Sequence, residues 1–224
     1  MQVYIAGAGK LAAELVERLE PKNGFHITRW REGVAQNAVG IVVHAGSGRE
    51  LQAITAYCAR TASVLIELST GSVLENSKLD FPVVLCPNTN ILMLKFMAML
   101  EQAGQMFQGY SVQVTESHQA SKSSVPGTAV VMAHSLGLKP SDIQSIRDTA
   151  IQLNDLGIPQ DHLARHAFHR IEIADGACSI SMESRVLGES AYAGGVQQIL
   201  GAIQNRLLQH RVYSINEFIA NGWL

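Results

Sequence analysis

A histidine and a lysine just ahead of a Gly-Thr pair are the residues in this chain whose types and spacing best fit chemistry. They are His118 and Lys122, which precede Gly127 and Thr128. An imidazole titrates close to physiological pH, so His118 can deliver a proton, while Lys122 supplies a fixed positive charge. The first amide groups of a helix that opens at the Gly-Thr pair lack internal partners and attract a carboxylate or phosphate. The spacing therefore predicts an acid and a cation beside an anion-binding cradle.

The residues on either side of this segment predict the elements that position it. Residues 110–115 alternate like a strand, with Val112 and Val114 on one face, and residues 129–138 read as an apolar helix. Residues 116–128 then form a polar loop between a strand and a helix. A solvated loop without chemistry is the simpler interpretation of one histidine and one lysine, so further motifs must decide between the two.

Four motifs in chain order supply that decision. Residues 116–129, in which Glu-Ser-His-Gln is followed by a lysine and by Gly-Thr-Ala, resemble the signature of the dihydrodipicolinate reductase family. Gln119 and the short spacing to Gly127 are more similar to the form found in plants and some bacteria. The resemblance continues, in family order, at Pro87-Asn88, residues 157–169 and residues 192–195. A set of four such motifs is far more specific than any one of them.

The resemblance implies an NAD(P)H-dependent oxidoreductase of lysine and diaminopimelate biosynthesis. It would reduce dihydrodipicolinate, or its hydrated 4-hydroxy precursor, to tetrahydrodipicolinate with NADPH or NADH. Hydride addition builds negative charge on the substrate ring, so a nearby proton donor and a cation lower the barrier. By resemblance His118 is the donor and Lys122 the cation. Gln119, Gly127 and Thr128 would bind the small cyclic dicarboxylate.

The chain departs from the family pattern at several points, and four of these positions bear on the substrate. Ser124 stands where the family has an aspartate, and Pro126 stands where it has a serine. Glu183 and Glu189 lie in the stretch before the last long helix, where the family carries basic residues. Acidic side chains facing the pocket would repel a dianion, so either they point away or the substrate is less charged. Two alternatives therefore stay open: a reductase of another cyclic imine, and a cofactor-binding relative without turnover.

A glycine-rich turn near the N-terminus predicts the cofactor site. Gly7 and Gly9 follow a strand-like segment and precede a helical pattern through Leu19, with Ala12 in place of the third glycine of the dinucleotide fingerprint. A bare backbone at this turn lets a pyrophosphate approach the helix start. Lys10 and Leu11, the first residues of that helix, are predicted to take part.

The second strand-like segment, residues 25–30, bears on the choice of cofactor. It ends in Thr-Arg-Trp-Arg, with no acidic residue for the ribose hydroxyl of NAD. Arg29 or Arg31 could instead pair with a 2′-phosphate, because guanidinium suits bidentate phosphate contact, and this favours NADPH. The resemblance adds the predicted cofactor residues Ser69, Thr70, Gly71, Pro87 and Asn88.

The order of the elements predicts an α/β fold with two domains. Strands and helices alternate as far as Cys86, which predicts a doubly wound, Rossmann-like nucleotide-binding domain. Asp175-Gly176 between two alternating segments predicts a hairpin in a second, α+β domain. We place the dinucleotide-binding domain at residues 1–90 plus 191–224, and the domain for substrate binding and oligomerisation at residues 91–190.

Composition excludes several classes of partner. A formal charge of −2, with 16% charged residues and no basic run, gives no footprint for nucleic acid or an anionic membrane. No segment approaches the length of a membrane-spanning helix, and the chain enters a strand directly after Met1, so we expect a cytoplasmic protein. The three cysteines, an odd number far apart, are expected to be reduced core thiols.

Two further expectations concern assembly and metal. Apolar residues of the second domain would lie on an exposed sheet, which predicts a homodimer or homotetramer; they are Ile171, Ile173, Ile180 and Met182. Three histidines are spaced by four and three residues, as zinc ligands on one helix face can be; they are His162, His166 and His169. The strand-like pattern from residue 167 breaks such a face, so no metal site is predicted.

Overall fold

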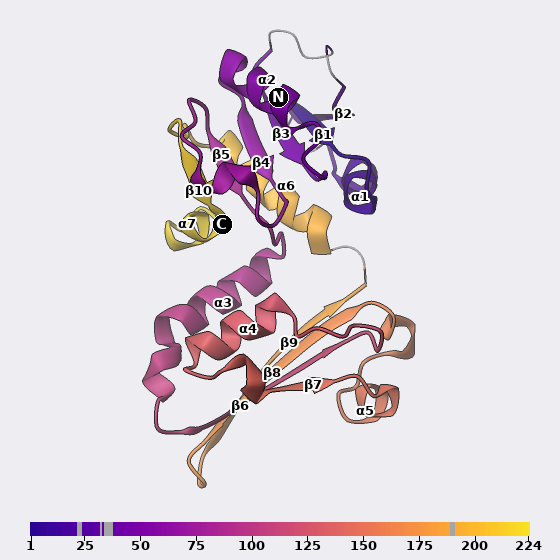
Figure 1. Ribbon diagram of the computed structural model, residues 1–224, viewed down its shortest axis with the longest axis vertical. Helices are drawn as coiled ribbons and strands as arrows, with labels where there is room; N and C mark the ends of the chain where they lie inside the picture. Colours follow the sequence, from indigo (N-terminus) through magenta and orange to yellow (C-terminus); the bar gives the residue numbers. More distant parts are fainter. Residues whose placement is uncertain (22–23, 32, 34–37, 189–190) are drawn as a thin grey trace. The chain divides into compact units, whose positions relative to one another are not determined.

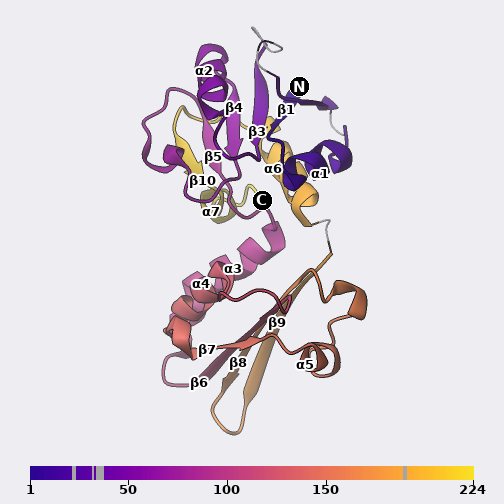
Figure 2. The same cartoon turned by 45° about the vertical axis from the view of Figure 1, so that its right-hand side comes forward.

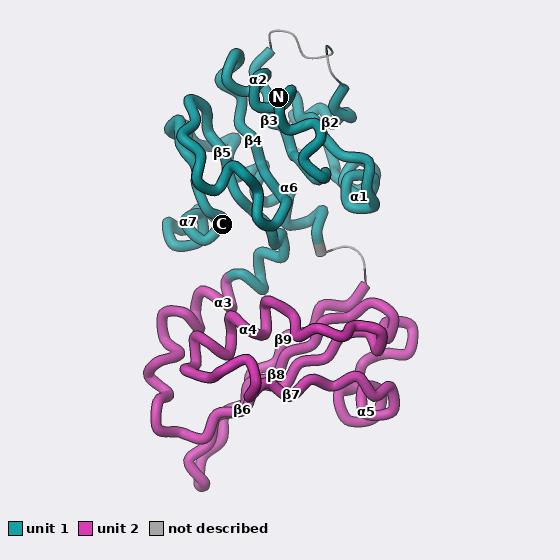
Figure 3. The backbone as a smooth tube through the Cα atoms, viewed as in Figure 1, with its two compact units in different colours: residues 1–94, 190–224 teal, residues 95–189 magenta. Residues whose placement is uncertain are grey.

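The computed structural model describes residues 1–21, 24–31, 33, 38–188 and 191–224. The chain divides into two compact units, Met1–Leu94 with Ser190–Leu224, and Lys95–Glu189 (Figure 3). The first unit extends to Leu94, where the sequence pattern places the limit at residue 90. No helix among the described residues has the length and apolar character needed to cross a membrane.

The first unit is built on a parallel sheet with strand order β10-β5-β4-β3-β1-β2 (Figure 1). Its six strands are β1 (Gln2–Ala6), β2 (His26–Arg29), β3 (Gly40–His44), β4 (Val64–Glu67), β5 (Val83–Leu85) and β10 (Val212–Ser214). The C-terminal tail joins this sheet, because β10 pairs with β5.

Helices cover both faces of this sheet, as the predicted doubly wound fold requires. Alternate residues of β1 enter different cores: Val3 and Ile5 pack in one cluster, and Tyr4 and Ala6 in the other. The first cluster receives α1 (Lys10–Arg18), α6 (Ala191–Gln204) and α7 (Ile215–Ala220), and the second receives α2 (Leu51–Thr61). Since both faces are buried there, β1, β3, β4 and β5 are nearly continuous apolar runs, whereas the edge strand β2 is mostly exposed.

A glycine in α6 permits its close approach to the loop after β5. A Cβ on Gly195 would lie 1.6 Å from the carbonyl oxygen of Thr89, whereas a Cβ on Gly194 would meet nothing within 4 Å. We predict that Gly195→Ala lowers the free energy of unfolding by about 3 kcal/mol, because α6 must shift. Gly194→Ala is the matched control and should raise it by about 0.5–1 kcal/mol through helix propensity. Urea unfolding of both variants tests this, and equal stabilities would contradict it.

The second unit is a mixed sheet with strand order β7-β6-β8-β9. Its strands are β6 (Ser111–His118), β7 (Ile143–Ile146), β8 (His166–Ala174) and β9 (Ser179–Leu187). β6 and β7 are parallel, and the other pairs are antiparallel. In Figures 1 and 2, α4 (Gly127–Ser135) lies over one face of this sheet beside α3 (Ile91–Ala103), whose first turn belongs to the first unit.

Shorter elements complete the fold. One is the helix α5 (Thr149–Asn154), which follows β7. The described 3-10 helices are η2 (Val73–Asn76), η3 (Gly104–Phe107), η4 (Pro140–Asp142) and η5 (Gln160–His162). The predicted hairpin is present between β8 and β9, where Gly176 has a φ of 95° and Asp175 Oδ1 accepts the N–H of Cys178 at 2.8 Å.

The structure corrects three expectations about the second unit. The strand ahead of the polar segment continues to His118, so this histidine ends a strand and does not lie in a loop. Ile171 and Ile173 are buried within the unit and expose no surface for assembly, although Ile180 is 44% exposed. Two of the four residues that predicted an oligomer are therefore buried within the unit. Separately, Cys178 is exposed next to the hairpin turn and is not a core thiol.

Candidate active site

A buried carboxylate holds the predicted proton donor. The side chain of Glu116 is fully buried, and its Oε2 lies 2.9 Å from Nδ1 of His118, whose side chain is 15% exposed. Its other oxygen, Oε1, accepts a hydrogen bond of 2.7 Å from the guanidinium of Arg147. The three side chains come from the end of β6 and from the residue after β7, which runs parallel to β6. Sequence analysis did not identify Arg147.

The charge on Glu116 fixes which nitrogen of His118 can act. Burial raises the pKa of the Glu116 carboxyl, but hydrogen bonds from His118 and Arg147 outweigh it and lower this pKa to about 2. The ionised carboxylate has no proton to donate, so Nδ1 of His118 donates to it. The other ring nitrogen, Nε2, is left as the atom that can exchange a proton with a ligand.

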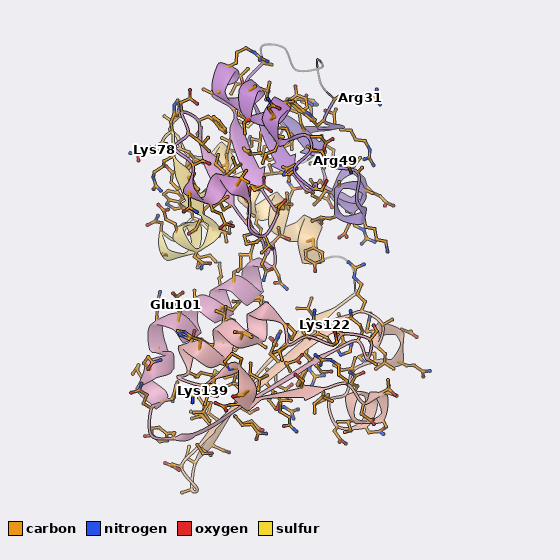
Figure 4. The ribbon with its side chains drawn as sticks, in the orientation of Figure 1. Arg31, Arg49, Lys78, Glu101, Lys122 and Lys139 are labelled. Atoms are coloured by element: carbon orange, nitrogen blue, oxygen red, sulfur yellow. The ribbon has the colours of Figure 1, made fainter. Side chains whose placement is uncertain are left out.

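The loop between β6 and α4 carries the predicted cation and ends at the predicted anion cradle. Lys122 lies in this loop (Figure 4) and is partly buried, and its backbone N–H donates to the carbonyl of Gln119 at 2.9 Å. Pro126 is the N-cap of α4 and makes no side-chain capping hydrogen bond. Within the part of the chain that the structure describes, the N–H groups of Gly127 and Thr128 therefore have no side-chain cap, as an anion site requires.

A second set of polar contacts supports the base of this site. Nε2 of Gln152, on α5, donates to the carbonyl of His118 at 2.8 Å and to Oγ of Ser117 at 3.0 Å. Oγ of Ser117 also lies 3.0 Å from Nε2 of His166, whose Nδ1 lies 3.2 Å from the carbonyl of Leu163. Sequence analysis gave Ser117, Gln152 and His166 no role. They fix the strand end from which His118 projects.

A third histidine, on β8, lies beside His118. The rings of His118 and His169 are 5.9 Å apart in an edge-to-face arrangement, and Nδ1 of His169 lies 3.1 Å from Oγ of Ser184. Burial and the neighbouring His118 lower the pKa of His169 to about 4, so its ring is neutral at physiological pH. His162 lies on η5, whereas His166 and His169 lie on β8, so the three histidines share no helix face.

We predict that His169 makes the folded protein acid-sensitive. Its folded pKa of about 4 is below the ordinary value of 6.5, so the unfolded chain takes up a proton first as the pH falls. The free energy of unfolding therefore falls by about 3 kcal/mol as the pH is lowered from 6.5 to 4. Above pH 6.5 the ring is neutral in both the folded and the unfolded chain, so His169 causes no pH dependence there. Urea unfolding at both pH values should show a smaller loss in His169→Gln. His26 is exposed, so His26→Gln should lose as much stability between the two pH values as the wild type. A wild-type loss in His169→Gln would contradict the prediction.

Of the two acidic residues that depart from the family pattern, the structure describes Glu183. Glu183 pairs with Arg170 at 2.6 Å and with Arg185 at 2.9 Å. It alternates along β9 with Ser184, which lies on the face of His169, so Glu183 lies on the opposite face of the sheet. It therefore does not face His118. Glu189 lies outside the described residues.

In the first unit, a pocket of about 650 Å³ lies between the loops after β1 and β3. The strand order places β2 on one side of β1 and β3 on the other, which makes this the topological switch point where open α/β sheets bind ligands. The lining residues are Ala8, Gly9, Ala45, Gly46, Ser47, Arg49 and Glu50.

The two predicted glycines are required for different reasons. Gly7 has a φ of 125°, and a Cβ there would lie 2.5 Å from the carbonyl oxygen of Ala45. Gly9 is the N-cap of α1, and a Cβ there would meet nothing within 4 Å. The first glycine lets the two loops touch, and the second leaves the pocket wall bare. This arrangement fits the pyrophosphate of a dinucleotide at the start of α1.

The other predicted cofactor residues lie at or just after the carboxyl ends of the parallel strands or at the start of α1. Lys10 and Leu11 begin α1. Arg29 and Arg31 lie at the end of β2 and just beyond it. Among the described residues, those that line the pocket include Arg49 but neither of these two arginines, and Figure 4 labels Arg31 and Arg49. The residues after β4 and β5 are Ser69, Thr70, Gly71, Pro87 and Asn88.

A buried histidine–glutamate pair joins two of these loops, and sequence analysis missed it. Nδ1 of His44 lies 2.8 Å from a carboxylate oxygen of Glu67, and these residues are partners on β3 and β4. Glu67 also accepts the N–H of Ser69 at 2.9 Å, and Oγ of Ser69 donates to the carbonyl of Gly46 at 3.0 Å. Burial raises the pKa of Glu67, but the hydrogen bonds from His44 and Ser69 outweigh it and lower this pKa.

Comparison with known proteins identifies relatives of the chain. It is 31% identical over 153 residues to 4-hydroxy-tetrahydrodipicolinate reductase 2, chloroplastic, from Arabidopsis thaliana, which covers 62% of this chain and 44% of that protein. It is also 34% identical over 123 residues to the probable 4-hydroxy-tetrahydrodipicolinate reductase 1, chloroplastic, from Oryza sativa subsp. japonica. That match covers 50% of this chain and 36% of that protein. The chain thus spans less than half the length of either plant protein. No family model matches it.

A solved structure shares the architecture of the chain. Dihydrodipicolinate reductase from Paenisporosarcina sp. TG-14, bound to dipicolinate, superposes with a TM-score of 0.65 over 96% of this chain and 97% of that one, at 14% identity. The class is therefore that of proteins with a Rossmann-like nucleotide-binding unit joined to a second, α+β unit. The chain is, more particularly, a relative of the plant 4-hydroxy-tetrahydrodipicolinate reductases, which confirms the resemblance predicted from its motifs.

Proposed function

We propose that the chain is an NAD(P)H-dependent 4-hydroxy-tetrahydrodipicolinate reductase of lysine and diaminopimelate biosynthesis. The observation that carries the proposal is the contact between the buried Glu116 and His118, in the strand that leads through Lys122 to the uncapped start of α4. A donor, a cation and an anion cradle within one segment suit a cyclic dicarboxylate that gains hydride. The named relatives support the same reaction.

The residues of the second unit divide the chemistry. A bound reduced nicotinamide supplies hydride to the conjugated ring. His118 holds a proton at Nε2 and delivers it as negative charge builds on the ring, while Glu116 stabilises the imidazolium form before the transfer. The N–H groups of Gly127 and Thr128 bind a substrate carboxylate, and Lys122 and Gln119 assist. Glu183 lies on the opposite face of the sheet and is paired with arginines, so its charge would not repel a dianionic substrate.

The first unit would hold the cofactor. Gly7, Gly9, Lys10 and Leu11 would bind the pyrophosphate of a dinucleotide, and the residues after β4 and β5 would contact its nicotinamide half. We propose a preference for NADPH, with Arg29 or Arg31 pairing with the 2′-phosphate. Titration with NADPH and NADH, with and without these guanidinium groups, tests the preference, and an unchanged affinity ratio would contradict it.

Assembly and location are also proposals. We propose a homodimer or homotetramer built through the second unit, with Ile180 on its exposed surface, and light scattering that shows a 24 kDa species would exclude it. The cytoplasmic location stays a prediction, and the plant relatives are named as chloroplastic.

The decisive experiment couples the purified chain to freshly generated dihydrodipicolinate synthase product and follows nicotinamide absorbance with each cofactor in turn. Turnover of this product supports the proposal. Tight NADPH binding without turnover would exclude it, and a screen of other cyclic imines would then separate a reductase of a different substrate from a binding protein without activity.

A further inference from the structure

One guanidinium contacts both the carboxylate that holds His118 and the backbone of the loop that carries Lys122. The side chain of Arg147 is 21% exposed and follows β7 directly. Besides its bond to Glu116, its Nε donates to the carbonyl of Lys122 at 2.8 Å, and it also reaches the carbonyl of Ser124 at 3.5 Å. Its Nη1 donates a further bond of 2.9 Å to the carbonyl of Ile146, so the guanidinium folds back onto the end of its own strand.

We infer that Arg147 is a positioning residue that sets the proton donor and the cation in one geometry. It acts on His118 through the carboxylate of Glu116, and on Lys122 through that residue's backbone carbonyl. This inference rests on the proposed function, in which His118 and Lys122 perform the chemistry. Arg147 itself needs no contact with the substrate.

The chemistry of the guanidinium group explains why an arginine is suited to this position. Its donors point in fixed directions within one plane, so a single side chain can bind a carboxylate and separate carbonyls together. A lysine carries the same charge but presents it as a point on a flexible stem. Lysine at position 147 would therefore keep the charge beside Glu116 and lose the fixed bonds to the loop.

Removal of the charge also leaves the fully buried Glu116 without its guanidinium partner. Arg147 is one of the groups that lower the pKa of Glu116 to about 2, so this pKa rises when the guanidinium is removed. A protonated Glu116 cannot stabilise the imidazolium form of His118. The acid limb of the pH profile should therefore move to higher pH in Arg147→Ala and stay near its wild-type position in Arg147→Lys.

Steady-state kinetics with dihydrodipicolinate tests this inference. Arg147→Ala should lose about 10²-fold in kcat/KM, because a small displacement of reacting groups has an effect of that size. Arg147→Lys should show a raised KM without the shift in the acid limb. The matched control is Arg170→Gln, which removes a guanidinium–carboxylate pair from the opposite face of the same sheet. It should retain kcat/KM within about twofold.

A measurement without substrate separates this inference from the proposed function. Hydrogen exchange should quicken at residues 119–124 in Arg147→Ala, and NADPH affinity should stay unchanged. If the wild type does not reduce dihydrodipicolinate, the proposed function fails, and faster exchange at these residues still supports the positioning role. Wild-type exchange in Arg147→Ala would overturn that role, as would wild-type kcat/KM. Should Arg147→Ala not fold, unchanged KM and exchange in Arg147→Lys would overturn it equally.

Discussion

Replacement of His118 by glutamine should lower kcat for dihydrodipicolinate by about 10²- to 10⁴-fold. Glutamine can still donate a hydrogen bond to Glu116 but cannot deliver a proton at neutral pH. The proton acts on the substrate and not on the cofactor, so NADPH affinity should stay intact. Stopped-flow oxidation of NADPH measures the loss in kcat, and fluorescence titration measures the affinity.

The control for this substitution is another histidine of the same unit. His134 is exposed on α4, so His134→Gln should keep wild-type turnover. Near-native turnover in His118→Gln would show that the end of β6 is not the active centre, and the relationship to the reductases would then stand for fold alone. A parallel loss in both variants would point to a general effect of substitution in this unit.

The elements around the site could be predicted because their signals are local. The helix predicted at residues 129–138 is present as α4, which begins at Gly127, and the turn at Gly7 and Gly9 lies between β1 and α1. In each case a glycine or a change of hydrophobic period marks the boundary within a few residues. The bounds of these segments therefore needed no knowledge of long-range contacts.

The residues that hold the site could not be predicted, because their contacts depend on strand pairing. Arg147 directly follows the four-residue strand β7, and Gln152 lies on the six-residue helix α5. Both elements are too short to give a periodic signal in the sequence. Their contacts with Glu116 and His118 span 31 and 34 residues. The pairing of His44 with Glu67 likewise depends on the register of β3 against β4.

The orientation of Glu183 is a case in which a sequence signal existed. Ile180 and Met182 alternate with polar residues along β9, which places Glu183 on the face opposite to them. The prediction from sequence treated the acidic stretch by its charge and not by this period of two. The period alone separates Glu183 from Ile180 and Met182, and the pairing of β8 with β6 and β9 then shows that His118 lies on the face opposite to Glu183.

Replacement of Gly9 by valine should reduce affinity for either nicotinamide cofactor by about 10²-fold or more. A branched side chain at the start of α1 fills the pocket wall that the pyrophosphate needs, and overlap of this kind costs about 3 kcal/mol. The protein alone has room for it, because a Cβ at Gly9 meets nothing within 4 Å and its φ is −81°. The loss should therefore appear mainly in titration, while thermal unfolding of the free protein should show only the small cost of valine as the N-cap of α1.

Two further variants sharpen this test. Gly9→Ala adds one methyl group and should weaken binding less than Gly9→Val, since the smaller group overlaps less. Gly7→Ala should act in the opposite way, lowering the unfolding temperature of the free protein, because its φ of 125° and the 2.5 Å approach to Ala45 strain any side chain. If Gly9→Val binds NADPH and NADH as tightly as the wild type, the turn between β1 and α1 does not hold the pyrophosphate. The cofactor would then have to bind elsewhere in the first unit.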